Sequence, residues 1–141
     1  MARPWSKVSA DLCEFNGRTL LVISDYYSNF IEVTRMTTTT SRSIIKALKE
    51  LFARYGVPDF MVSDNGPQFS SAEFMAFAKT WNFDHKTSPH YHQSNGKAEN
   101  AVRTVKRLLR KCKDSGQSEF LSLMAGGTHP LKVLGQAPHS A

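Results

Sequence analysis

Residues 60–67, FMVSDNGP, lead an apolar segment directly into a tight turn. The run Phe60–Ser63 has the length and apolar character of a short buried strand. Asp64 ends that strand, and the Asn-Gly-Pro that follows is a strong turn signal. Beyond the turn, Ser70 and Glu73 have the spacing of a capping box, which predicts the start of a helix. A strand, a turn and a helix in this order are typical of an α/β fold.

The residues before this stretch contain three further strand signals. Apolar and polar side chains alternate over Lys7–Leu12, and Asn16-Gly17 is the strongest short signal for a hairpin. The apolar runs Thr19–Ser24 and Phe30–Met36 come next along the chain. We therefore expect these three segments to form an antiparallel meander at the start of the fold.

A helix is predicted between the meander and the fourth strand. Apolar side chains recur at helical spacing over Ile44–Tyr55. Ser41 or Ser43 is the expected N-cap, and Gly56 follows the last turn. Pro58 lies two residues further on, where it cannot continue the helix.

The second half of the chain adds a strand and a long helix. Phe83–Thr87 predicts a fifth strand, Ser88–Gly96 is a polar loop, and helical periodicity runs from about Lys97 to Lys113. The predicted order is β-β-β-α-β-α-β-α, so the expected fold class is α/β, with a five-stranded mixed sheet flanked by helices. A length of 141 residues fits one domain with a sizeable core.

The long helix has one apolar face and one basic face. At about 100° per residue, its apolar stripe, which we expect to face the core, comprises Ala98, Val102, Val105, Leu109 and Cys112. A second stripe comprises Glu99, Arg103, Lys106, Arg110 and Lys113. The helix holds seven cations and one acid, so it carries the whole net charge of +6. This concentration favours a polyanion partner over a merely solvated helix face.

Cysteine spacing and apolar runs argue against several other classes of protein. Cys13 and Cys112 lie 99 positions apart, without the paired spacing of a disulfide framework or a Cys-rich zinc site. His90 and His92 lack cysteine partners and predict no zinc site either. Residues 1–12 lack the apolar core of a secretory signal, and no apolar run has the length of a membrane span. We therefore expect an intracellular protein without a membrane partner.

Three acidic residues occupy positions that favour a metal site. Asp11 lies on the first strand, Asp64 ends the fourth, and Glu99 opens the long helix. Strands one and four are usually neighbours at the centre of such a sheet, and the helix can bring its carboxylate over their ends. Carboxylates that meet repel one another unless divalent cations join them, and oxygen ligands favour Mg²⁺ or Mn²⁺. Taken singly, Asp64 is also explained as a turn former and Glu99 as an acid on the helix dipole.

Three stretches carry a resemblance to a known family. They are residues 11–33, DLCEFNGRTLLVISDYYSNFIEV, residues 52–74, FARYGVPDFMVSDNGPQFSSAEF, and residues 88–109, SPHYHQSNGKAENAVRTVKRLL. Together they resemble the integrase catalytic core of gypsy-type long-terminal-repeat retrotransposons, with retroviral integrases as more distant relatives. The resemblance implies a ribonuclease H-like fold and a nuclear protein that acts on DNA.

The resemblance also implies a D,D,E metal site. Asp11 matches the first acid, Asp64 the second and Glu99 the third, as catalytic residues and as ligands of Mg²⁺ or Mn²⁺. The family reaction is polynucleotidyl transfer. Water first trims the 3′ end of the element's DNA, and the freed 3′ hydroxyl then attacks a phosphodiester of the target DNA.

Two further sets of residues match DNA-contacting parts of the family. The loop before the glutamate corresponds to Gln93, Ser94 and Asn95. The basic helix face that holds the DNA backbone corresponds to Lys97, Arg103, Lys106 and Arg110. Asp25 is likewise a family feature, which we interpret as structural.

The sequence departs from the family pattern at two places. Asp64 and Glu99 are separated by 34 residues, one fewer than is habitual in the family, and His92 stands where relatives have proline. After Lys113 the pattern is lost, so we assign residues 1–113 to the integrase catalytic core and residues 114–141 to a divergent or truncated tail. Late helices support the core dimer in retroviral relatives, so this tail puts the homodimer of the family in question.

Two alternatives to an active integrase therefore stay open. One is a catalytically impaired, retrotransposon-derived DNA-binding domain, which the short spacing and the divergent tail favour. The other is a ribonuclease H-like nuclease that acts by hydrolysis alone. The presence of all three acids and of the QSNGKAE motif favours the integrase.

Overall fold

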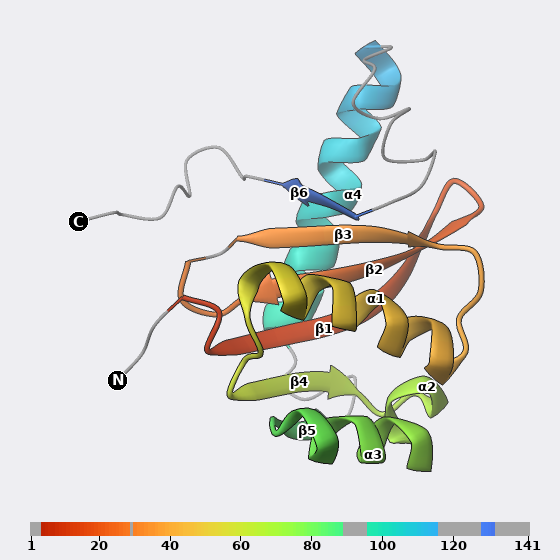
Figure 1. Ribbon diagram of the computed structural model, residues 1–141. Coiled ribbons are helices and arrows are strands. Elements are labelled where there is room, and N and C mark those ends of the chain that lie inside the picture. Colours follow the sequence, from red (N-terminus) through yellow and green to blue (C-terminus); the bar gives the residue numbers. More distant parts are fainter. Residues whose placement is uncertain (1–3, 29, 89–95, 116–127, 132–141) are drawn as a thin grey trace.

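The fold is a mixed sheet with helices on both faces (Figure 1). The computed structural model describes residues 4–28, 30–88, 96–115 and 128–131, and it describes only the backbone of residues 88, 96–99, 112, 113, 115 and 128–131. The elements in chain order are β1 Lys7–Phe15, β2 Arg18–Asp25, β3 Ile31–Met36, α1 Ser41–Tyr55, β4 Phe60–Asp64, α2 Pro67–Ser70, α3 Ala72–Trp81, β5 Asp84–Ser88, α4 Gly96–Ser115 and β6 Thr128–Leu131.

The first three strands form the antiparallel meander that the sequence predicts. β1 pairs with β2, and β2 pairs with β3. The hairpin between β1 and β2 turns at Asn16-Gly17, where φ is 57° and 77°. Positive φ at both residues is typical of the two-residue hairpin turn, so the predicted hairpin is confirmed.

The remaining strands extend the sheet at both edges, in the order β5-β4-β1-β2-β3-β6. β4 runs parallel to β1, and β5 runs parallel to β4. All five predicted strands are present, and the predicted α/β class with a mixed sheet is correct. A sixth strand, β6, pairs antiparallel with β3 through Ile31 and Leu131. This strand falls within the residues assigned to the divergent tail, and the sequence pattern did not predict it.

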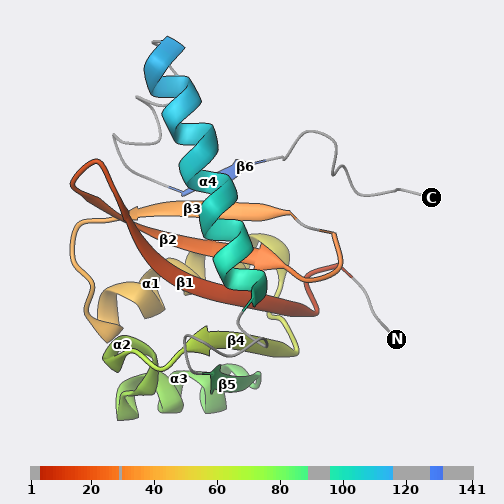
Figure 2. The same ribbon diagram turned by 180° about the vertical axis from the view of Figure 1, so that it is seen from behind.

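The two faces of the sheet carry separate apolar cores. α1, α2 and α3 cover one face (Figure 1), and α4 crosses the other (Figure 2). Under α1 and α3, the core includes Ile23, Leu48 and Phe74, all fully buried. Under α4, the smaller core comprises Cys13, Leu20, Val22, Ile31, Val33, Ala101, Val105 and Leu109. Burial on both faces explains why β2 has an almost continuous apolar sequence.

Two helix starts differ from the prediction by one to three residues. The N-cap of α1 is Thr40, whose Oγ1 accepts a hydrogen bond from the backbone N–H of Ser43 at 3.1 Å, so Ser41 and Ser43 are not the cap. The N-cap of α3 is Ser71, whose Oγ accepts from the N–H of Phe74 at 3.1 Å. Ser70 instead ends the short helix α2, so the predicted capping box is wrong.

The long helix α4 extends slightly beyond both of its predicted ends. Val105 and Leu109 are buried as predicted, whereas Val102 is only half-buried and Ala101 takes its place in the core. The side chains of Ala98 and Cys112 lie outside the described residues. In the described part of the chain, no helix combines the length and the apolar character needed to cross a membrane.

Candidate metal and nucleic-acid site

Asp11 and Asp64 lie side by side on two neighbouring parallel strands, where β4 ends beside the middle of β1. The register of β1 and β4 pairs Ser9 with Val62 and Ala10 with Ser63. Asp11 and Asp64 each come one residue after the last of these pairs. Since parallel strands of one register present their side chains to the same face, both carboxylates lie on one face of the sheet. Both residues are partly exposed, so solvent and ions can reach this edge.

This face is the one that α4 covers. Side chains alternate along a strand, so Asp11 shares its face with Cys13, which packs against α4. Burial raises the pKa of Cys13 to about 11, while Lys106 of α4 lowers it and Asp11 raises it further. Lys106 and Asp11 thus both lie within electrostatic reach of the same thiol. A cation of the basic helix therefore stands close to the strand that carries the first acid.

A tight turn holds the carboxylate of Asp64. Its Oδ1 accepts a hydrogen bond from the backbone N–H of Gly66 at 2.9 Å. A Cβ added at Gly66 would lie 3.0 Å from Asp64 Oδ1 and 3.0 Å from Oε1 of Gln68. The absence of a side chain at residue 66 therefore leaves room for the carboxylate, which explains the glycine in the turn. Asp11 is held in a similar way, since its Oδ1 accepts from the N–H of Leu12 at 2.9 Å.

The outer surface of α4 is strongly basic. Arg103 and Arg110 are exposed, and Lys106 is half-buried. Arg103 Nη1 donates a hydrogen bond to Asn100 Oδ1 at 3.2 Å. Figure 2 shows α4 crossing one face of the sheet, and the strand register places the two acids on that same face.

Several predicted site residues lie partly or wholly outside the described structure. Glu99 and Lys97 belong to the first turn of α4, but their side chains lie outside the described residues. The loop residues Gln93, Ser94 and Asn95 lie wholly outside. Among the side chains that the structure describes, no group of three or more His, Cys, Asp or Glu could hold a metal ion. The structure thus brings together Asp11 and Asp64, and the position of the Glu99 carboxylate stays a prediction.

Sequence comparison assigns the family. A sequence model described as the integrase core domain matches residues 2–93, which is more than half of the chain. The chain belongs to this family. The matched region of the integrase core includes both aspartates and ends before Glu99 and α4.

Similar proteins come from animals and retroviruses. The uncharacterized protein K02A2.6 of Caenorhabditis elegans is 36% identical over 115 residues, which are 80% of this chain and 9% of that protein. The Gag-Pol polyprotein of koala retrovirus is 32% identical over 113 residues, which are 78% of this chain and 7% of that protein. This integrase core therefore spans only a small part of the length of the curated relatives it matches.

Solved structures confirm the ribonuclease H-like fold. The catalytic core domain of BIV integrase superimposes with a TM-score of 0.72 at 24% identity, covering 84% of this chain and 80% of that one. The HTLV-2 integrase catalytic core domain in complex with magnesium superimposes with a TM-score of 0.66 at 27% identity, covering 79% of this chain and 74% of that one.

A polar pair behind Asp64, made of a buried serine and a half-buried histidine, was not predicted from the sequence of this integrase core. Ser63 is fully buried, and its Oγ lies 2.7 Å from Nε2 of His85. The same Oγ donates to the backbone carbonyl of Asp64 at 3.0 Å. Burial lowers the pKa of His85 to about 4, so the ring is neutral at pH 7. The only available sequence signal was a polar residue inside an apolar strand, since the partner is 22 positions away.

Asp25 has the structural role that we assigned to it. It is almost fully buried, and its Oδ2 accepts hydrogen bonds from the N–H of Trp5 at 2.9 Å and from Oγ of Ser28 at 2.7 Å. Its Oδ1 accepts from the N–H of Tyr27 at 3.2 Å. These bonds hold the turn after β2 and attach the N-terminal segment to the sheet.

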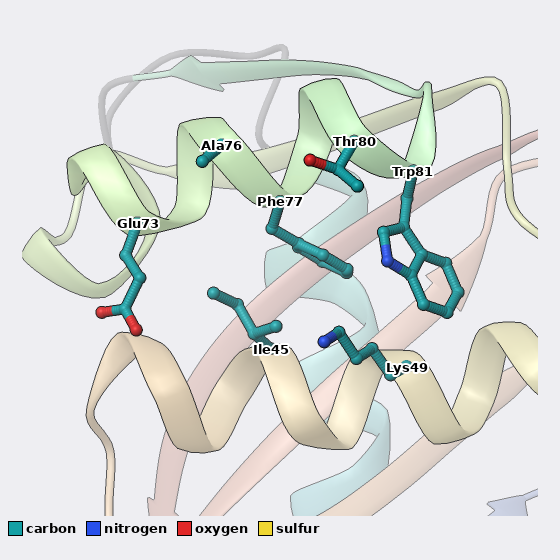
Figure 3. Close-up of a pocket in the computed structure, with 7 residues that line it drawn as sticks. All are labelled: Ile45, Lys49, Glu73, Ala76, Phe77, Thr80 and Trp81. Carbon is teal, nitrogen blue, oxygen red and sulfur yellow. The ribbon is translucent and has the colours of Figure 1, made fainter.

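A hollow of about 240 Å³ lies on the opposite side of the molecule, between α1 and α3 (Figure 3). Ile45 and Phe77 form its apolar floor, and Lys49 lies with its Nζ 5.9 Å from the ring centre of Trp81. Its one carboxylate, Glu73, has no second acid beside it among the lining residues. The lining therefore lacks the paired acids of a divalent-metal site, and the candidate site is the edge that carries Asp11 and Asp64.

Proposed function

We propose that this chain is the catalytic core of a DNA integrase of the gypsy-type retrotransposon class, acting by metal-dependent polynucleotidyl transfer. The observation that carries the proposal is the adjacency of Asp11 and Asp64 on the sheet face beside a basic helix. Membership of the integrase core family supports the reaction class. The stretches around residues 11–33, 52–74 and 88–109 support the gypsy-type assignment. Action on chromosomal DNA entails a nuclear location.

The two aspartates fit a divalent metal site. Two carboxylates on neighbouring strands repel each other, and a shared cation removes that repulsion. Their hard oxygen donors suit Mg²⁺ or Mn²⁺ better than a soft metal ion. The related HTLV-2 core was solved in complex with magnesium, which is consistent with this assignment. We assign Asp11, Asp64 and Glu99 as the ligands, with the bound ions stabilising the charge on the attacking and leaving oxygens of a phosphodiester.

The remaining site residues of the chain would bind and orient DNA. Arg103, Lys106 and Arg110 offer cations to the phosphate backbone on the same side of the sheet as the acids. We add Lys97 from the same helix and Gln93, Ser94 and Asn95 from the preceding loop. In the first reaction a water oxygen bonds to phosphorus and the bond from that phosphorus to the element's 3′ oxygen breaks. The 3′ oxygen takes up a proton, and the 3′-terminal nucleotides are released with a 5′ phosphate. In the second reaction the freed 3′ hydroxyl bonds to a target phosphorus, and the target 3′ oxygen leaves with a proton.

A DNA-binding domain without catalysis is the second candidate. The spacing of 34 residues between Asp64 and Glu99 and the loss of the family pattern after Lys113 favour it. A shift of about 1 Å in a catalytic group can reduce the rate about 100-fold. In this alternative the basic helix still binds duplex DNA, but Glu99 does not complete the metal site.

A strand-transfer assay with Mn²⁺ distinguishes the candidates. We suggest a branched oligonucleotide that already joins the donor end to the target, because it removes the need for domains that assemble two DNAs. Wild type is expected to form product, and Glu99→Gln and Asp64→Asn are expected to form none. Equal yields from wild type and both variants would refute the enzyme, and product from hydrolysis alone would indicate a nuclease. DNA binding without any product would support the second candidate.

A further inference from the structure

We infer that His85 is a positioning residue for Asp64, acting through the buried hydroxyl of Ser63. The inference rests on the proposed function, since it concerns how one of the two adjacent acids is held. Ser63 and His85 lie on the face of the sheet opposite to Asp64, because side chains alternate along β4. His85 therefore supports the acid from behind, without being a ligand at the same site.

The hydrogen bonds have a defined direction. The carbonyl of Asp64 can only accept, so the single proton of the Ser63 hydroxyl is donated to it, at 3.0 Å. The contact of 2.7 Å between Ser63 Oγ and His85 Nε2 then requires that the imidazole donates. His85 Nε2–H therefore donates to Ser63 Oγ, and Ser63 Oγ–H donates to the carbonyl oxygen of Asp64. This order predicts a neutral ring with its proton on Nε2.

The same imidazole also contacts the segment that follows Asp64. The ring centre of His85 lies 6.3 Å from that of Phe69 in α2 and 4.8 Å from that of Phe74 in α3. Phe69 is almost fully buried, and its N–H donates to the carbonyl of Gly66 at 3.0 Å. His85 thus contacts the residue before Asp64 by a hydrogen bond and the helix after it by ring packing. The His85 side chain therefore contacts the chain both before and after the turn that begins at Asp64.

Loss of this support would let the turn move without unfolding the domain. The strand pairing of β4 with β1 and β5 involves backbone atoms that a change at His85 leaves in place. Some residues hold a metal ligand in place without binding the metal themselves. Replacing such a residue typically lowers the affinity for the metal by about 10- to 100-fold. The expected effect is therefore a change in Mn²⁺ affinity rather than in folding.

Four variants test the inference. In His85→Gln the side-chain amide can still donate to Ser63, whereas His85→Leu keeps bulk and loses the donor. Ser63→Thr keeps the hydroxyl, and Ser63→Ala removes it. Calorimetry with Mn²⁺ should show affinity reduced by about 10-fold in His85→Leu and Ser63→Ala. It should show most of the affinity retained in the two conservative variants. Thr87→Val is the matched control on the same strand, exposed and expected to bind as wild type.

Two NMR measurements test the inference without requiring either catalysis or metal binding. The Gly66 amide, which donates to Asp64 Oδ1, should change its chemical shift in His85→Leu and Ser63→Ala but not in Thr87→Val. The imidazole ¹⁵N shifts of wild type should place the proton on Nε2 at pH 7. A proton on Nδ1, an unchanged Gly66 amide, or equal Mn²⁺ affinity in His85→Leu and His85→Gln would each overturn the inference. Failure of wild type in strand transfer would refute the enzyme and leave these readouts valid.

Discussion

Asp11 and Asp64 stand beside each other on neighbouring parallel strands, each one residue beyond the pairing of Ala10 with Ser63. They are 53 positions apart in the chain, so only the pairing of β1 with β4 makes them neighbours. Asp64 ends β4, whereas β1 continues past Asp11 to Phe15. The carboxyl edge of parallel strands, where Asp64 lies, is where open α/β sheets bind their ligands. At this edge the two carboxylates share a face with the basic helix.

Removing either carboxylate should stabilise the protein without metal and abolish its stabilisation by metal. Asp64→Asn keeps the acceptor for the Gly66 N–H but relieves the repulsion from Asp11, so the melting temperature without metal should rise. Wild type should gain about 2.7 kcal/mol of stability at an Mn²⁺ concentration 100 times its Kd, and the variant should gain none. Thermal unfolding with and without Mn²⁺ measures both effects. Glu50→Gln on α1 is the control, and an equal gain in Asp64→Asn would contradict the metal site.

Gly66→Ala should weaken metal binding while the fold survives. The backbone at residue 66 has φ of −66°, which alanine adopts readily, so the change in the free energy of unfolding should stay below about 1 kcal/mol. The new methyl group would lie 3.0 Å from Asp64 Oδ1 and would displace it. Calorimetry with Mn²⁺ should show a severalfold loss of affinity. Gln68→Ala, which leaves the carboxylate in place, should bind normally; wild-type affinity in Gly66→Ala would count against Asp64 as a ligand.

Lys106→Glu should weaken binding to duplex DNA and reduce its salt dependence. Each lost phosphate contact lowers the slope of log K against log salt by about 1. Lys46 on α1 is an exposed lysine on the opposite face, so Lys46→Glu is matched in charge and should leave the slope unchanged. Fluorescence anisotropy over a range of salt concentrations measures both variants. An equal reduction in the two variants would show that the effect comes from net charge alone.

Acid should destabilise the protein partly through His85. Its pKa is about 4 in the folded protein against 6.5 for an exposed histidine, with burial as the cause. As the pH falls below 6.5 the unfolded chain takes up a proton that the folded chain does not, so stability decreases down to pH 4 and the contribution then levels off. Urea unfolding of wild type and His85→Gln over pH 4–7.5 should show that their difference varies across this window. If the difference in unfolding free energy between wild type and His85→Gln stays constant with pH, groups other than His85 take up the proton.

Asp25→Asn should destabilise the protein without changing its metal site. An amide nitrogen in place of Oδ2 cannot accept from both Trp5 N–H and Ser28 Oγ, so the expected loss is about 1–3 kcal/mol. Urea unfolding measures this loss. Mn²⁺ affinity should match wild type, and a large decrease in affinity would assign Asp25 to the site instead of to the turn.

Local signals in the sequence were enough to predict most elements of the fold. The hairpin at Asn16-Gly17, the helical period of α1 and the strand that ends at Asp64 each depend on side chains within a few residues of one another. Helix caps were predicted less well, because Thr40 and Ser71 have neighbours of the same chemistry that compete for the role. The sequence also predicted that Asp64 ends a strand, since strand ends and turns are local features.

Pairings between distant segments were decided only by the tertiary structure. The register that sets Asp11 beside Asp64, the contact of Ser63 with His85 and the pairing of β6 with β3 all join residues far apart in the chain. Periodicity reports which face of an element is apolar but carries no information about which residue lies opposite. The sequence by itself therefore determined most of the elements and the candidate acids. The tertiary structure decided which side chains of the strands meet. The reason is that the strands come into register only when the folded chain packs the sheet between α1 and α4.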